Sequence, residues 1–376
     1  MKKANNQKNV LLLGSTSFFN DISSETLFTL LPVYLDSPIS LGLIGGIISG
    51  LGDFIKVFFG YLSDKLGKRK ILVQLGYLIS SLSKLIIPFI DKVWLFLLMI
   101  FDRLGKGIRE SPRDSIISLS KKKGKAFGIQ KAMDTSGAII GGLLAYFFIS
   151  NGFELKSALL VAALIGFLAL LPLYFVKVPP FKKTNKKLHK TLKELPSDLK
   201  KFSIVSGMFG LVLISPLFLI KTAYVTFGDK GLLIYTLFNI IYVISAAYFG
   251  SLSDRVGRDI ILKFSFLSAA LSFFFMFLGS FGIIVGLVLY GAAFGSFRSS
   301  ANAFVSEIGG SNKGTALGLF QTILGISIFT GSLLFGYLLK ILSNNAYLIG
   351  SLFSILTLVI YQFIFNPKIY PRNWKV

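Results

Sequence analysis

The sequence predicts an all-α membrane protein, and three observations support this fold class. Of the 376 residues, 53% are hydrophobic, and the mean hydropathy of +0.71 is above that of ordinary soluble domains. Apolar runs of about 20 residues, the length that crosses about 30 Å of hydrocarbon, recur from Val10 to Phe365. In addition, two motifs of the first half recur in the second half, which indicates a duplicated helical unit.

The apolar runs predict twelve membrane-spanning helices. The expected spans are 10–35, 41–62, 71–90, 93–118, 125–150 and 156–177 in the first half, then 203–226, 231–252, 260–279, 282–305, 315–341 and 346–365 in the second. Between the halves lies a polar segment with eight lysines, for which a solvated linker is favoured over a segment that docks on anionic lipid. We therefore expect an N-terminal six-helix bundle at 1–177, a cytoplasmic basic linker at 178–202 and a C-terminal six-helix bundle at 203–376.

The formal net charge of +23 comes from lysines and arginines that gather in alternate loops. Three loops on one predicted side carry them: Lys65, Lys68, Arg69 and Lys70; Lys121, Lys122, Lys123 and Lys125; and Arg255 with Arg258. Because positive loops remain in the cytoplasm, we expect a multi-pass protein of the bacterial inner (plasma) membrane with both termini cytoplasmic. Basic residues dispersed among apolar spans also argue against nucleic-acid binding.

The rare residue types exclude several kinds of chemistry. The chain has no cysteine and a single histidine, His189, so disulfides, thiolate metal centres and histidine metal centres are excluded. A glycine-rich phosphate-binding loop with its Lys-Ser/Thr pair is also missing, which argues against ATP as the energy source. Without a His or Cys nucleophile system, we expect no enzyme activity, and we expect no cofactor and no metal site.

Two sequence motifs repeat at a constant offset of 190 residues. The matched positions are Gly60, Asp64 and Gly67 with Gly250, Asp254 and Gly257, and Lys123, Gly124, Ala126 and Gly128 with Lys313, Gly314, Ala316 and Gly318. Two matches at one offset indicate a duplicated six-helix unit. Membrane transporters commonly place the substrate path between two such units, which rock against each other.

The loop after the second predicted helix, Gly60-Tyr-Leu-Ser-Asp64-Lys-Leu-Gly67-Lys-Arg69-Lys, resembles the signature loop of the major facilitator superfamily. This resemblance implies the major facilitator fold, with two pseudo-symmetric six-helix bundles. An Asp at a cytoplasmic helix end can accept hydrogen bonds from a neighbouring helix N-terminus and pair with a basic residue. We therefore expect a conformational latch with these candidate residues: Gly60, Asp64, Gly67, Arg69, Asp254 and Arg258.

The fourth predicted helix carries an unusual number of charges on one face. At 100° per residue, seven ionisable residues fall within about 140° of each other: Asp102, Arg103, Lys106, Arg109, Glu110, Arg113 and Asp114. Each would cost at least about 2.5 kcal/mol facing lipid at the helix centre, so they line a watery cavity or pair within the bundle. For the last four, an ion-pair ladder and a functional role are equally supported. Arg103 with Gly107 resembles the helix-four motif of the superfamily, whose arginine is implicated in proton coupling, and Lys106 stands where that motif has glutamine.

Charged residues near the middle of other helices complete the candidate site. Asp21 and Glu25 lie one turn apart on the first helix, where mutual repulsion favours binding a proton, although a cation site or pairing with Arg103 or Lys106 also fits. Asp134 lacks an obvious partner on its own helix. Arg298 lies near the middle of the tenth helix, where it could touch an anionic group or a carboxylate. The full candidate set for proton coupling or the substrate cavity is Asp21, Glu25, Asp102, Arg103, Lys106, Asp134 and Arg298.

Segments of three helices together resemble one bacterial subgroup of the superfamily that includes nickel-resistance exporters. They are Asn20 to Glu25, Asp102 to Asp114, and Ala132 to Thr135. The resemblance implies a secondary active transporter, and we expect proton-coupled efflux of a small organic or drug-like solute by alternating access. A divalent metal exporter of the nickel, cobalt or iron type and a non-transporting membrane receptor are the alternatives. The expected partners are the small-molecule substrate, protons and the lipid bilayer, and we expect a monomer.

The glycine run on the fifth helix has two interpretations. Gly137, Gly141 and Gly142 resemble the antiporter motif of the superfamily, but the proline of that motif is missing. A face of small residues that lets two helices approach closely in lipid explains the run equally well.

Overall fold

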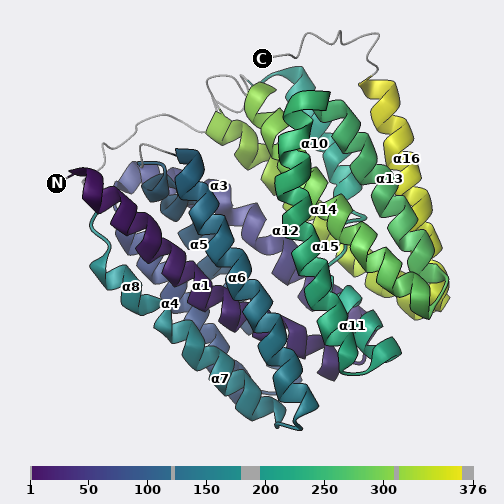
Figure 1. Cartoon of the computed structure of the whole chain (residues 1–376), viewed down its shortest axis with the longest axis horizontal. Coiled ribbons are helices and arrows are strands. Elements are labelled where there is room, and N and C mark those ends of the chain that lie inside the picture. Colours follow the sequence, from purple (N-terminus) through teal and green to yellow (C-terminus); the bar gives the residue numbers. More distant parts are fainter. Residues whose placement is uncertain (1, 120–122, 179–194, 309–312, 366–376) are drawn as a thin grey trace. The chain divides into compact units, whose positions relative to one another are not determined.

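A computed structural model of the chain describes residues 2–119, 123–178, 195–308 and 313–365, and all regular structure in these residues is helical (Figure 1). The first six passes are α1 (Lys2–Tyr34); α2 (Pro38–Gly46) with η1 (Ile47–Leu51) and α3 (Gly52–Leu66); α4 (Arg69–Ile86) with η2 (Ile87–Phe89); α5 (Lys92–Ile117); α6 (Lys123–Ser150); and α7 (Leu155–Leu168) with α8 (Leu170–Phe175). The remaining six are α10 (Ser197–Gly210) with α11 (Pro216–Phe227); α12 (Lys230–Val256); α13 (Arg258–Phe277); α14 (Ser280–Ile308); α15 (Lys313–Leu342); and, after η4 (Ser343–Asn345), α16 (Ala346–Ile364). The predicted all-helical class and the twelve passes are confirmed.

The seventh pass differs from the single helix expected at 203–226. The chain leaves the helix after Gly210 and starts α11 at Pro216, which lies at the first helical position. A residue before proline is disfavoured in the α conformation, and proline itself suits a helix start because it lacks an N–H. The Ser215 hydroxyl caps the new helix by accepting from the Leu217 amide at 3.3 Å. The break in the helix therefore follows from Pro216. Hydropathy did not predict it, because the run remains apolar on both sides of the proline.

Eight helical segments within the described residues are long and apolar enough to cross a membrane. Two long helices, α1 and α5, are not among them. Both are interrupted by charge: α1 carries Asp21 and Glu25, and α5 carries the seven ionisable residues of its polar face. Membrane helices with such residues keep them inside the bundle or a water-filled cavity, so these two helices are where a site is expected.

The chain divides into two compact units. The first contains Met1–Asp36 and Ile47–Lys187, and the second contains Ser37–Gly46 and Leu188–Val376. Within the second unit, α2 packs closely on α15, since a Cβ at Gly42 would lie 2.7 Å from the Ser332 carbonyl oxygen. The second pass therefore contributes to both units, whereas the sequence had suggested one bundle over 1–177. The π-helix η1 begins where the chain enters the first unit.

Glycines set the closest helix contacts of the first unit. On α6, a Cβ at Gly137 would lie 2.5 Å from the Phe18 carbonyl oxygen, and one at Gly141 would lie 2.6 Å from that of Ile22. Gly76 on α4 and Gly105 on α5 face each other in the same way, since a Cβ added to either would lie 2.5 Å from the carbonyl oxygen of the other. Small residues allow backbones to approach this closely in lipid, where van der Waals packing replaces the hydrophobic effect. The packing interpretation of the α6 glycines is therefore visible directly in the α1–α6 contact.

The substitution Gly105→Ala should destabilise the first unit by about 1–3 kcal/mol, the usual cost of overpacking. The added methyl group would meet backbone atoms of α4, which cannot rotate away as a side-chain end can. Thermal unfolding of the purified protein measures the effect. Gly128→Ala on α6 is the matched control, because its Cβ would meet nothing within 4 Å. Equal melting temperatures for the two variants would contradict this account of the α4–α5 contact.

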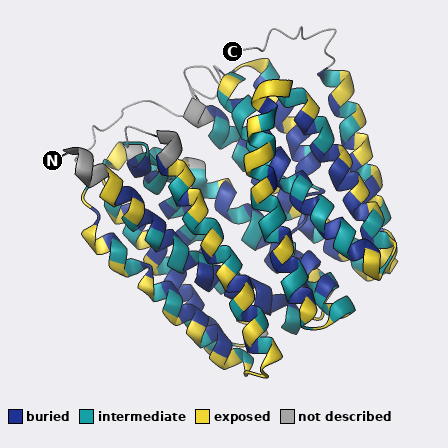
Figure 2. Cartoon of the chain, viewed as in Figure 1, coloured by how far each residue is buried: buried dark blue, intermediate teal, exposed yellow. Residues whose placement is uncertain are grey.

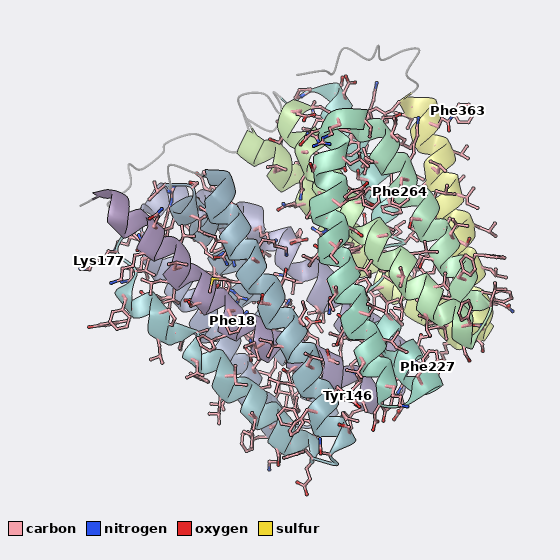
Figure 3. The ribbon with its side chains drawn as sticks, viewed as in Figure 1. Phe18, Tyr146, Lys177, Phe227, Phe264 and Phe363 are labelled. Atoms are coloured by element: carbon pink, nitrogen blue, oxygen red, sulfur yellow. The ribbon has the colours of Figure 1, made fainter. Side chains whose placement is uncertain are left out.

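The second unit has an aromatic core. Its buried rings belong to Phe202, Phe209, Phe266, Phe297, Phe320 and Tyr361. Edge-to-face contacts join them, for example Phe209 with Phe266 at a centroid distance of 4.6 Å. In both units the exposed residues include large apolar ones, such as Leu171 on α8 and Phe363 on α16, which is 78% exposed and points outward (Figures 2 and 3). Exposed apolar side chains of this kind are suited to contact with lipid.

Candidate functional site

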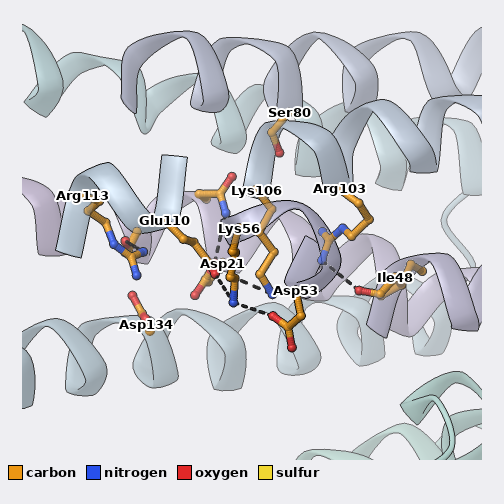
Figure 4. Close-up of polar contacts among 12 residues, drawn as sticks. Asp21, Ile48, Asp53, Lys56, Ser80, Arg103, Lys106, Glu110, Arg113 and Asp134 are labelled. Atoms are coloured by element: carbon orange, nitrogen blue, oxygen red, sulfur yellow. Dashed lines mark hydrogen bonds and ion pairs between the residues drawn. The ribbon is translucent and has the colours of Figure 1, made fainter. Parts of the chain in front are cut away.

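A cavity of about 200 Å³ lies in the first unit, among α1, α4, α5 and α6. Its lining is strongly charged: Asn20, Asp21, Ser24, Glu25, Phe28, Tyr77, Arg103, Lys106, Arg109, Glu110, Arg113, Lys131, Asp134 and Ala138. Five of these residues are basic and four are acidic. Figure 4 labels six of the charged ones, namely Asp21, Arg103, Lys106, Glu110, Arg113 and Asp134. The polar face of α5 therefore lines a cavity and does not face lipid, as its charge requires.

The Gly76–Gly105 contact positions polar side chains of α4 and α5 at the cavity and behind its wall. Because α4 and α5 touch backbone to backbone there, side chains one residue to one turn away are brought together. Tyr77, the neighbour of Gly76, lies under the Arg109 guanidinium, whose Cζ is 4.5 Å from the ring centroid. Ser80, one turn further along α4, donates a hydrogen bond to Asp102 on α5.

Asp102 and Arg103 form an ion pair in the interior of the first unit. The Asp102 carboxylate accepts from Arg103 Nε at 2.8 Å and from Nη2, and both side chains are almost completely buried. Arg103 Nη1 also donates to the Ile48 carbonyl oxygen at 3.4 Å. Ile48 belongs to the π-helix η1, where the normal helical hydrogen-bond register is interrupted. The guanidinium lies over the Phe28 ring, 4.7 Å from its centroid, and so reaches the cavity.

A second ion-pair group connects α3 to α5. Lys56 bridges Asp53 on its own helix and Glu110 on α5, with Nζ 2.6 Å from the Glu110 carboxylate. Lys106 lies one turn before Glu110, 3.7 Å from its other oxygen. Glu110 is therefore satisfied by two lysines. This part of the α5 face is an ion-pair ladder, one of the two roles that the sequence left open.

The carboxylates of Asp21 and Asp134 have different surroundings. Asp21 on α1 accepts from Asn20 Nδ2 at 3.0 Å, and Asp134 on α6 accepts from Gln130 Nε2 at 2.8 Å. No ion pair in the described residues includes either carboxylate. Both line the cavity, and the Gly137 contact draws α6 onto α1 beside Asp21. These are thus two partly exposed carboxylates that face one cavity from adjacent helices (Figure 4).

A single hydroxyl on α1 connects all four helices around the cavity. Ser17 Oγ lies 2.9 Å from the Tyr77 hydroxyl, 3.0 Å from Arg113 Nη1 and 2.6 Å from Gln130 Nε2. These partners come from α4, α5 and α6, respectively. This buried network holds the four helices in one arrangement, although the Gln130 side-chain oxygen is left without a hydrogen-bond partner among the described residues.

Lys84 connects α4 to two residues of α1 that line the cavity. Its Nζ donates to Asn20 Oδ1 at 3.2 Å and to Ser24 Oγ at 2.9 Å, and the residue is only 2% exposed. Asn20, which also donates to Asp21, thereby connects this buried ammonium to the cavity. Lys84 was not among the candidate residues that the sequence indicated. Its position opposite two polar residues of α1 depends on helix contacts that spacing along one helix does not reveal.

The structure brings five of the seven predicted cavity residues together. Asp21, Glu25, Arg103, Lys106 and Asp134 all line the cavity. Asp102 lies behind Arg103 and is completely buried. Arg298 belongs to the second unit, where its guanidinium lies over the Phe294 ring at 5.4 Å. Arg109 and Tyr77 also line the cavity, and Ser17 supports it. The sequence placed Arg109 on the charged face but not in the candidate set, and it did not indicate Tyr77.

The two repeated loop motifs share a backbone feature. Gly67 ends α3 with φ of 69° and Gly257 ends α12 with φ of 99°, values that glycine adopts without strain. Each amide donates to the carbonyl oxygen four residues earlier, at Ser63 and Ser253, respectively. The recurring glycine of the motif thus terminates a helix in both units.

In the second motif, Arg258 begins α13 and contacts the ends of two other helices of the second unit. It pairs with Asp254 at the end of α12 and with Glu307 near the end of α14, at 2.7 Å. In the first motif, Gly60 lies within α3 and Arg69 begins α4. Asp64 also lies in α3, but its side chain is outside the part of the chain that the structure describes. The basic linker at 179–194 is likewise outside it.

Comparisons with known proteins agree with this architecture. The sequence matches the Major Facilitator Superfamily over residues 13–228 and, in a second match, over 202–375. It is 40% identical, over 95% of each chain, to an uncharacterized transporter of this type from Methanocaldococcus jannaschii. Multidrug resistance protein 2 of Bacillus subtilis is 25% identical over 75% of each chain.

Solved transporters share the fold at low sequence identity. A point mutant of the nucleoside transporter NupG aligns with a TM-score of 0.82 over 95% of this chain and 100% of that chain, at 16% identity. The xylose transporter XylE of E. coli aligns with a TM-score of 0.70 over 96% and 100%, also at 16% identity. The resemblance to nickel-resistance exporters stays a prediction. The chain belongs to the Major Facilitator Superfamily and is a multi-pass membrane secondary transporter of a small-molecule substrate, not an enzyme.

Proposed function

We propose that this transporter exports a small organic solute in exchange for protons, with Asp21 and Asp134 as the groups that take up and release the proton. One observation supports the proposal: both carboxylates line the cavity, and neither forms an ion pair with any residue that the structure describes. A carboxylate locked to a lysine or arginine stays charged, whereas one held by an amide and open to a cavity can gain a proton as its surroundings change. Efflux is supported by the distant multidrug resistance relative.

Asp102 and Glu110 are less suited to carry the proton. Asp102 is bound by Arg103 and Ser80, and Glu110 by two lysines. Each would leave a buried cation without its partner if it were protonated, which is costly in a membrane interior. We therefore assign these two carboxylates to positioning Arg103 and the lysines around the cavity.

Orientation and the latch complete the proposal. The positive loops of the sequence support cytoplasmic termini in a plasma membrane. In the second unit, the Arg258 contacts with Asp254 and Glu307 would hold the ends of α12, α13 and α14 together in one state of the transport cycle. The corresponding role in the first unit falls to Asp64 and Arg69, with Gly67 shaping the turn between α3 and α4 and Gly60 lying within α3.

Export of a divalent metal ion is the less favoured candidate. The described residues contain no group of three or more His, Cys, Asp or Glu side chains that could hold a metal ion. The carboxylates of the cavity also share it with five basic residues, whose charge repels a divalent cation.

Transport in proteoliposomes tests the proposal. A gradient of one pH unit supplies about 1.4 kcal/mol per proton, which allows about tenfold solute accumulation for one-for-one exchange. We expect members of a panel of small organic solutes to be accumulated under such a gradient and to move protons, as detected by an internal pH dye. Nickel chloride is included in the panel. Proton movement with nickel alone, or with no compound of a broad panel, would overturn the proposal.

A further inference from the structure

Arg109 has an unusual position for a buried arginine. It lies on α5, lines the cavity and is only 3% exposed. Its Nε and Nη1 atoms are buried and have no hydrogen-bond partner, and no ion pair in the described part of the chain includes it. Its one close contact of note is the Tyr77 ring beneath the guanidinium. The Tyr77 ring therefore holds the flat face of the Arg109 guanidinium, and the N–H donors in the guanidinium plane stay without acceptors.

Neighbouring arginines on the same helix show how this membrane environment normally satisfies a guanidinium. Arg103 is bonded to Asp102 and to the Ile48 carbonyl oxygen. Arg113 is bonded to Asp114 and to Ser17. Burying a charged donor without a partner is costly, so unpaired donors at a cavity indicate a group that arrives from outside. Of these three arginines, Arg109 is the one for which the described part of the chain supplies no hydrogen-bonding partner.

The surroundings of Arg109 favour an anion as that group. Asp21 and Asp102 are its acidic electrostatic neighbours. However, the Asp21 carboxylate takes its hydrogen bond from Asn20, and the Asp102 carboxylate is bonded to Arg103 and Ser80, so neither forms an ion pair with Arg109. The cavity also holds the basic residues Lys106 and Lys131. Arginine presents up to five N–H donors in a planar fork that fits a carboxylate or phosphate. The cavity of about 200 Å³ is smaller than the roughly 300–1,000 Å³ of drug-sized sites, which suits a compact molecule.

We propose that Arg109 is the receptor for an anionic group of the solute, so that the cargo is a small organic anion with a carboxylate or a phosphate. This inference rests on the proposed function, because it names the solute class of the same cavity. It does not depend on proton coupling, since binding is measurable in the absence of any gradient. The Tyr77 ring orients the guanidinium, and the solute accepts a hydrogen bond from the part of the guanidinium that lines the cavity.

Ligand-dependent thermal stability of the purified full-length protein tests this inference. The probes are benzoate, phenyl phosphate and the uncharged benzyl alcohol, which share one ring and differ in the polar group. We expect benzoate or phenyl phosphate to raise the melting temperature in a saturable way, because a ligand that binds only the folded state stabilises it. The stronger of the two anions identifies the carboxylate or the phosphate class. Benzyl alcohol should give no saturable shift.

Variants separate binding by Arg109 from general charge effects. Arg109→Gln should weaken the anion response at least about tenfold, a loss of about 1.4 kcal/mol, and Arg109→Lys should restore part of it. Arg255→Gln is the matched control, because this arginine is exposed at the end of α12. Without ligand, Arg109→Gln should be at least as stable as the wild type, since it removes an unpaired buried charge. A purely structural arginine would instead lower the melting temperature when replaced.

Three results would overturn the inference: an equal response to benzyl alcohol, an unchanged anion response in Arg109→Gln, or no response of the wild type to either anion. Each is distinguishable from failure of the proposed function. Proton-driven transport restricted to neutral or cationic solutes would leave that function in place and remove the anion site. Saturable anion binding through Arg109 without proton movement would keep the site and remove proton coupling.

Discussion

Asp21→Asn should abolish pH-driven solute accumulation in proteoliposomes while downhill exchange of the same solute continues. An asparagine resembles a permanently protonated aspartate, so the cavity keeps its shape and its hydrogen bond with Asn20 but can no longer release a proton. Accumulation under one pH unit should therefore fall from about tenfold to equality of the two sides. Counterflow of labelled solute with no pH gradient measures the part of transport that survives.

The charged groups that face Asp21 make this effect specific to its position. Asp134 on α6 lies across from it, and Arg109 and Lys106 on α5 provide the nearest positive charge. Asp91→Asn is the matched control, because that carboxylate is exposed before the start of α5, and it should accumulate solute as the wild type does. Normal accumulation by Asp21→Asn would assign the proton to another group. Loss of both accumulation and counterflow would show that Asp21 binds solute and does not carry the proton.

The fold was largely predictable from the sequence because membrane spanning leaves few alternatives. Helices satisfy their backbone groups internally, so a run of about 20 apolar residues in lipid has essentially one structure. The expected spans 71–90 and 93–118 correspond within a few residues to α4 with η2 and to α5. Hydropathy alone could not show the break before Pro216 or the π-helix at Ile47–Leu51. Both occur inside runs that remain apolar.

The polar face of α5 was predictable, but the partners of its residues were not. Helical periodicity placed seven ionisable residues on one face, and the structure puts that face on the cavity and the ion-pair ladder. Partner choice depends on which helix lies opposite and how near it comes. Gly76 and Gly105 set that distance for Tyr77 and Arg109, and a contact between two helices leaves no periodic signal in either one.

The repeat shows which unit carries the charge. At the 190-residue offset, Asp102, Arg103, Lys106 and Arg109 correspond to Ala292, Ala293, Ser296 and Ser299. The second unit has an aromatic core and serine hydroxyls bonded to carbonyl oxygens where the first has ion pairs. Arg298 corresponds to Ile108, on the apolar face of the fourth helix, so the offset does not place it at the position of any cavity arginine. The two halves therefore share the pattern of helices, but the second half lacks the charged residues that line the cavity of the first.

Asp102→Asn should destabilise the protein by about 3–5 kcal/mol, the usual cost of breaking a buried ion pair by removing one partner. The neutral amide would leave the Arg103 guanidinium, which is only 3% exposed, without its carboxylate. It would also disturb the hydrogen bond from Ser80, which fixes α4 to α5. Thermal unfolding of the purified protein should show a large drop in melting temperature, accompanied by loss of anion-dependent stabilisation if Arg103 leaves the cavity wall.

The same helix supplies a control for this prediction. Asp114 forms an ion pair with the adjacent Arg113 at 3.0 Å, in the same sequence-neighbour arrangement, but its side chain is 47% exposed. Ion pairs that solvent reaches contribute about 0–1 kcal/mol, because solvent screens the attraction and solvates the carboxylate. The Arg113 side chain is only 11% exposed, but its hydrogen bond to Ser17 does not depend on Asp114. Asp114→Asn should therefore change stability by at most about 1 kcal/mol. Comparable losses in the two variants would mean that burial does not set the strength of the Asp102–Arg103 pair, and that the cavity wall is held by the other helix contacts.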